Sequence, residues 1–152
     1  MKKQRFTRPL ALILALLFVA ASFVGCQKAP ESQSGFCTVV LEGDPATEYT
    51  VNLDNVTGDN GLLSVLDYLK ETEGLTYAEN GGMLTEVGSV KENAAAFQYV
   101  YIWTSVEKDF DVSEYASTKT YGERTLTSSG VGAKDMTITD GAVIYIGLFS
   151  WS

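Results

Sequence analysis

The residues that could do chemistry in this chain are two cysteines, a group of carboxylates and a run of alternating aromatic side chains. The 152 residues include no histidine, which excludes a Ser-His-Asp triad, a Cys-His pair and a histidine-bound zinc. Asn80-Gly81-Gly82 lacks the Lys and Ser/Thr that would follow in a phosphate-binding loop. Composition does not exclude a carboxylate pair of the kind that hydrolyses glycosides, because any acidic protein supplies many such pairs. We therefore expect a protein that is not an enzyme and has no cofactor or metal of its own.

Four carboxylates lie close together in the sequence, at Glu107, Asp109, Asp111 and Glu114. Spaced carboxylates in a loop can bind calcium, but the EF-hand loop needs a longer series of ligands and a glycine at its sixth position. Both are missing from this segment. We expect a solvated acidic loop.

Cys26 follows a leader with three recognisable parts. The first nine residues carry four basic side chains, Leu10 to Val24 carries no charge, and a glycine precedes Cys26. This order is typical of a secretory signal peptide with a small-residue cleavage site. The apolar run is shorter than the roughly 20 residues of a membrane span. We expect export and cleavage, with an uncleaved anchor helix as the alternative.

The leader resembles a bacterial lipoprotein signal peptide, and Phe23-Val24-Gly25-Cys26 resembles its lipobox. The resemblance implies cleavage before Cys26 and a diacylglyceryl thioether on its sulfur. Stable anchoring takes two acyl chains, which a diacylglycerol provides. We expect a signal peptide over residues 1–25, a flexible lipidated tether over 26–35 and one domain over 36–152. The domain would be anchored at the outer side of the bacterial cytoplasmic membrane or at the cell surface.

The charge of the exported part limits its partners. Residues 1–25 hold four of the 11 basic residues and none of the 19 acidic ones, so residues 26–152 carry a net charge of −12. Such a surface repels phosphate backbones and anionic lipid, so we expect no nucleic-acid partner and a membrane contact through the lipid alone. Once Cys26 is acylated, Cys37 is the single remaining thiol, and we expect it to be buried as a small apolar residue.

Aromatic side chains alternate along two predicted strands, so each set shares one face of a sheet. If the strands are neighbours, the two sets form a platform for a planar ligand or a sugar ring. The alternative is that the rings are core, or that they are covered by the long segment 107–139. The candidate ligand-binding residues are Tyr99, Tyr101, Trp103, Tyr145, Phe149 and Trp151, with Phe97 on the same face as the first three.

The elements that position these rings follow from hydrophobic periodicity. Residues 36–42 and 48–53 read as a hairpin, 61–72 as an amphipathic helix, and 97–106 and 142–151 as strands. We expect Leu62, Leu66 and Leu69 on the buried side of the helix, with Leu63 and Val65 widening this apolar stripe. Asp59 or Asn60 is the expected N-cap, and Gly74 follows the end of the helix. Segment 107–139, rich in Ser, Thr, Gly and acidic residues, reads as a long loop. The expected fold class is α+β, a β-grasp-like mixed sheet with one principal helix packed across it.

The helix segment Ser64-Val65-Leu66-Asp67-Tyr68-Leu69 resembles the Val-Leu-Asp-x-Leu helix of a bacterial domain-of-unknown-function family related to the C-terminal domain of transcobalamin and intrinsic factor. Trp103, Gly130-Val131 and Asp140-Gly141 follow in the same order. The resemblance implies a lipoprotein with a non-catalytic binding role, for a corrinoid or another small ligand that it hands to a transporter. The alternative is a structural or protein-interaction module of the cell envelope.

Cys26→Ala should abolish lipidation, because the thioether needs its sulfur. In cells that grow with an alkyne fatty acid, the wild-type protein should take up the label, and the variant should be unlabelled and move to the soluble fraction. Cys37→Ala is the matched control and should keep the label. Continued acylation of Cys26→Ala would contradict the lipoprotein interpretation.

Overall fold

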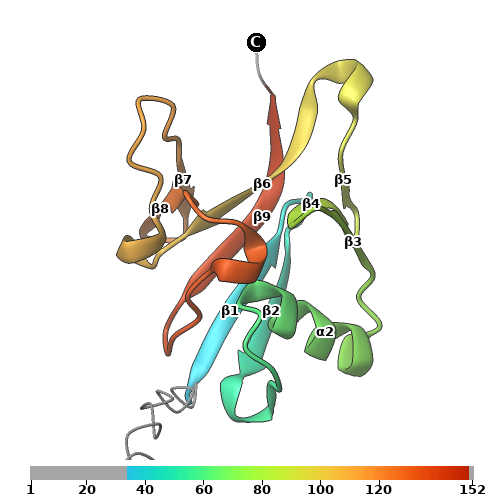
Figure 1. Ribbon diagram of the computed structural model, residues 1–152, viewed down its shortest axis with the longest axis vertical. Coiled ribbons are helices and arrows are strands. Elements are labelled where there is room, and N and C mark those ends of the chain that lie inside the picture. Colours follow the sequence, from blue (N-terminus) through green and yellow to red (C-terminus); the bar gives the residue numbers. More distant parts are fainter. Residues whose placement is uncertain (1–33, 151–152) are drawn as a thin grey trace, which may run out of the picture. The chain divides into compact units, whose positions relative to one another are not determined.

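A six-stranded mixed sheet forms the centre of the computed structural model, which describes residues 34–150. Its strand order is β2-β1-β9-β6-β8-β7 (Figure 1). The neighbours β1 and β9 run parallel, and every other pair in this sheet is antiparallel. The strands are β1 (Phe36–Leu41), β2 (Thr47–Asn52), β6 (Gln98–Thr104), β7 (Thr118–Tyr121), β8 (Arg124–Ser128) and β9 (Val143–Ser150).

A second sheet and one principal helix accompany the large sheet (Figure 1). The α+β class, the mixed sheet and the principal helix are therefore confirmed, whereas we expected one sheet and the described residues form two. Within the described residues no helix is long and apolar enough to cross a membrane. The second sheet consists of β3 (Tyr77–Asn80), β4 (Met83–Val87) and β5 (Val90–Lys91). The principal helix is α2 (Leu62–Glu73), and the 3-10 turns are η2 (Leu53–Asn55), η3 (Ala94–Ala96), η4 (Glu107–Asp109) and η5 (Ala133–Asp135).

Helix α2 buries the side that its periodicity predicts. Leu62, Leu66 and Leu69 are at most 2% exposed and pack in the main core. Gly74 ends the helix in the left-handed conformation, as expected, with φ of 70°. The main core joins this helix to the apolar face of the large sheet, where Ile144 and Ile146 are fully buried.

The N-terminus of α2 differs from the prediction. Neither Asp59 nor Asn60 caps it; Gly61 occupies the N-cap position, and the Ser64 hydroxyl accepts the Asn60 N–H at 3.0 Å. Tertiary structure explains why glycine occupies this position. A Cβ on Gly61, which has φ of 53°, would come within 2.6–2.9 Å of three carbonyl oxygens in the segment 133–136. Only glycine allows the helix to begin this close to that segment.

Segment 107–139 is not one long loop, so that expectation is wrong. It contains β7 and β8, an antiparallel hairpin that joins the sheet beyond β6. Leu126 of β8 is fully buried and gives the hairpin its apolar anchor.

Phe97 was also expected in a strand, but it precedes β6 with φ of 53° and is 63% exposed. Cys37 is buried as expected, and burial raises the pKa of its thiol to about 11. Cys26 and Trp151 lie outside the described residues.

Leu66→Ala should lower the free energy of unfolding by about 2–5 kcal/mol, because the removed side chain leaves a cavity that a packed core closes only in part. Leu63→Ala on the same helix is the control and should cost less, since Leu63 is only partly buried. Urea denaturation of the two variants measures both values. Equal losses at the two positions would mean that Leu66 is not the central core residue of α2.

Candidate functional site

The two expected aromatic faces coincide, because β6 and β9 are paired neighbours. Trp103 lies opposite Tyr145, and Tyr99 lies opposite Phe149. The rings of Tyr101 and Phe149 stack at 5.0 Å between centroids, and Trp103 meets Tyr145 edge to face at 6.1 Å. Four of the six candidate rings thus form one cluster on the sheet face opposite α2. Tyr99 is half-buried and belongs to neither core cluster.

The inner half of this ring cluster is covered rather than open. Trp103 is 3% exposed and Tyr145 is 7% exposed. The Trp103 indole N–H donates to the Ser117 hydroxyl at 3.0 Å, just before β7, and the Lys119 ammonium of β7 lies 4.6 Å from the Tyr145 ring centre. Of the two alternatives, covered rings are therefore observed at Trp103 and Tyr145, whereas Tyr101 and Phe149 are half-buried.

Two polar contacts hold the β7–β8 hairpin over the rings. Lys119 pairs with Glu42 at the end of β1, and the Glu42 carboxylate also accepts the Leu148 N–H at 2.8 Å. The Tyr121 hydroxyl donates to Glu48 of β2. Strands β7 and β2 are the two edges of the large sheet, so these contacts show that the sheet curls around its aromatic face.

The Glu42–Lys119 pair keeps both groups charged. Partial burial raises the pKa of Glu42. Its bonds to Lys119 and to the Leu148 N–H together lower that pKa by a larger amount, so the net pKa lies below 4.5. Partial burial lowers the pKa of Lys119. The neighbouring Glu42 raises that pKa by a larger amount, so the net pKa lies above 10.5. The pair therefore acts as a charged clamp on the hairpin at neutral pH.

The acidic segment is engaged with its own chain. Asp109 is 4% exposed, and its carboxylate accepts both the N–H and the hydroxyl of Thr137, the latter at 3.0 Å. Asp111 accepts the Ser113 N–H at 2.8 Å. The expectation of a solvated loop is wrong for Asp109, which ties the start of this segment to its end. In residues 34–150 no three candidate ligands gather closely enough to hold a metal ion.

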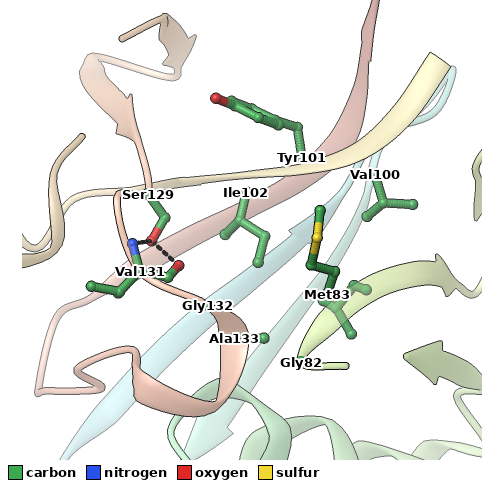
Figure 2. A pocket seen from close by; sticks show the side chains of 10 residues that line it. Gly82, Met83, Val100, Tyr101, Ile102, Ser129, Val131, Gly132 and Ala133 are labelled. Carbon is green, nitrogen blue, oxygen red and sulfur yellow. Dashed lines mark hydrogen bonds between the residues drawn. The ribbon is translucent and has the colours of Figure 1, made fainter. Parts of the chain in front are cut away.

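A groove that the sequence did not predict lies on the other side of β6 (Figure 2). Its inner hollow measures about 110 Å³. In Figure 2 the side chains of Met83, Val100 and Ile102 point toward the hollow, and the Tyr101 ring points to the opposite side of β6. The inner hollow is lined by Gly82, Met83, Leu84, Val100, Tyr101, Ile102, Ser129, Val131, Gly132 and Ala133.

An outer hollow of about 470 Å³ shares Gly82, Met83 and Gly132 with the inner one. We call the two together the Met83 groove. Met83 is 70% exposed and Val131 is 37% exposed, so two apolar side chains face solvent at its rim. Ser129 fixes Val131, because its hydroxyl donates to the Val131 carbonyl at 2.9 Å and accepts the Val131 N–H (Figure 2). The remaining residues that line the outer hollow are Leu63, Glu79, Gly81, Lys134 and Asp135.

No protein-family model matches the chain, and no curated protein matches it significantly. Among solved structures, the chain is similar to a "putative metal binding protein" from Ruminococcus gnavus ATCC 29149. The two share 14% identity with a TM-score of 0.49, over 78% of this chain and 100% of that one. A likeness of this size carries no argument about function. The resemblance to the transcobalamin-related family stays a prediction.

Glu42→Gln should destabilise the protein in a pH-dependent way. The pKa of Glu42 is lowered in the folded state, so its contribution is present above pH 4.5 and is lost as pH falls through the folded pKa. We expect a loss of about 1 kcal/mol at neutral pH, because both partners are partly solvated, and convergence with the wild type in acid. Urea denaturation over a pH series measures it.

Glu86→Gln is the control, because it removes the exposed ion pair with Lys91 and should change stability little. A Glu42→Gln penalty that stays constant into acid would contradict the charged clamp.

Proposed function

We propose that this protein is a lipid-anchored, non-catalytic binding module at the outer side of the bacterial membrane, and that it takes its ligand in the Met83 groove. The observation that carries the proposal is the exposure of Met83, 70% in a groove whose floor is buried or half-buried. Exposed apolar side chains around a hollow with few polar groups are typical of binding sites.

A non-catalytic role agrees with the chemistry of the groove. The chain has no histidine, and the Ser129 hydroxyl is already engaged with Val131. The outer hollow has Glu79 in its wall, and the Glu79 carboxylate accepts the Gly82 N–H at 2.7 Å. The buried Asp109, outside the groove, is engaged with Thr137 of its own chain. The inner hollow thus offers apolar walls beside one engaged hydroxyl, and the charged residues Glu79, Lys134 and Asp135 line only the outer hollow.

A corrinoid is the first small ligand to test, because the family resemblance implies it. The accessible end of the ring cluster, at Tyr101 and Phe149, is a second surface for such a ligand. The alternative function is a protein-interaction module of the envelope. It is favoured because β6 leaves part of one edge unpaired by β8 beside the groove.

A thermal-shift screen with cyanocobalamin and a panel of glycans tests the proposal on the full chain in detergent. A ligand at 100 times its Kd should stabilise the native protein by about 2.7 kcal/mol. The shift should be lost in Met83→Lys and kept in Val112→Lys, which makes the same change at a 96% exposed position outside the groove. An equal shift in Met83→Lys would exclude the groove as the site.

A further inference from the structure

Strand β6 has one edge that is only partly paired. Along one side it pairs with β9 over its whole length, from Gln98 to Thr104. On the other side β8 pairs only with Trp103 and Thr104. Within the part of the chain that the structure describes, no strand pairs with this side of β6 from Tyr99 to Ile102.

The main-chain groups of Val100 face this open edge. Alternate residues of an antiparallel strand direct their N–H and C=O groups to the same side. Gln98 exchanges two main-chain hydrogen bonds with Asn93 on this side, and the Ile102 carbonyl accepts the Ser129 N–H there at 2.8 Å. Val100 lies midway between them, so its N–H and C=O point to the same side.

The open edge and the Met83 groove are the same place. Residues 100–102 of β6 line the inner hollow, although the Tyr101 ring points away from it (Figure 2). The main-chain N–H and C=O of Tyr101 point to β9, and those of Val100 point to the open edge. A molecule in the groove meets a main-chain donor and acceptor on β6 and the apolar side chains of Met83 and Val131 at the rim.

We infer that the ligand of the groove is an extended, basic segment of a partner polypeptide, which adds to β6 as a short strand at Val100. The inference rests on the proposed function and names its ligand class. Addition to a sheet edge takes affinity from main-chain hydrogen bonds and specificity from pockets for alternate side chains. Asn93 and Ser129 close the two ends, so only a few residues of the partner fit between them.

The volume of the inner hollow fits a single side chain. It is about 110 Å³, well below the roughly 300–1,000 Å³ of pockets that enclose drug-sized molecules, whereas the outer hollow of about 470 Å³ leaves room for the neighbouring residues of a segment. Residues paired across an antiparallel ladder place their side chains on the same face. The partner residue opposite Val100 therefore directs its side chain toward the hollow, where an apolar side chain meets Val100, Ile102 and Met83.

The acidic surface of the domain indicates the charge that its partner carries. Residues 36–152 hold 18 acidic and six basic side chains. In the outer hollow, Glu79 and Asp135 stand against the single Lys134. A segment with basic residues beside its apolar one is complementary to this surface, and an acidic segment is repelled.

The probe is a fluorescein-labelled peptide, Lys-Arg-Thr-Leu-Thr-Arg-Lys, added to the full chain in detergent and followed by fluorescence anisotropy. It should bind the wild type and Val112→Lys equally, and Met83→Lys at least about tenfold more weakly. The same peptide N-methylated at Leu keeps every charge but lacks the N–H for the Val100 carbonyl. It should also bind at least about tenfold more weakly.

Equal binding of the two peptides would overturn the inference, because charge attraction alone would then explain it. So would the absence of binding. If the peptide fails while a small ligand still gives a shift that depends on Met83, the proposed function stands without this ligand class; if both fail, both are wrong. Dimerisation that Met83→Lys abolishes would make a second copy the occupant and would also overturn the inference.

Discussion

Burial of strand β9 on both faces is the constraint on which the rest of the structure depends. Val143, Ile144, Tyr145 and Ile146 are each at most 7% exposed, and they contribute alternately to the core under α2 and to the ring cluster. The strand lies between β1 and β6, and its parallel neighbour β1 comes from the opposite end of the domain sequence. The central sheet is therefore complete only when the first and last strands of the domain pair, which makes its contacts strongly non-local.

Strand β6 divides the surface that remains into two unlike sides. On the ring side, the β7–β8 hairpin, held by Lys119 and Glu42, closes over Trp103 and Tyr145. On the other side, β8 leaves β6 after two paired residues, and the Met83 groove begins where that pairing stops. The same hairpin thus covers Trp103 and Tyr145, two of the predicted ligand-binding residues, and leaves the Met83 groove open.

The spacing of apolar and aromatic residues predicted those features of the fold that depend on one helix or strand alone. The spacing of Leu62, Leu66 and Leu69 is enough to identify the buried side of α2, and the alternation along β6 and β9 is enough to place their rings on one face. The Gly61 cap could not be predicted, since its reason is a set of carbonyls more than 70 residues away. The β7–β8 hairpin carries one buried apolar residue, Leu126, in a Ser- and Thr-rich segment that reads as a loop.

The groove could not be predicted for a related reason, because β6 and two turns from distant parts of the chain build it. The available signal was apolar residues beside glycine, Met83 after Gly81-Gly82 and Val131 between Gly130 and Gly132. Residue-resolved amide hydrogen exchange of the free protein measures whether the main chain at Val100 is open. The Val100 amide should exchange at least about 100-fold faster than the Tyr101 amide, which faces β9, because exchange at a paired amide requires local opening. Equal protection of the two amides would show that this edge of β6 is already paired and closed to a partner strand.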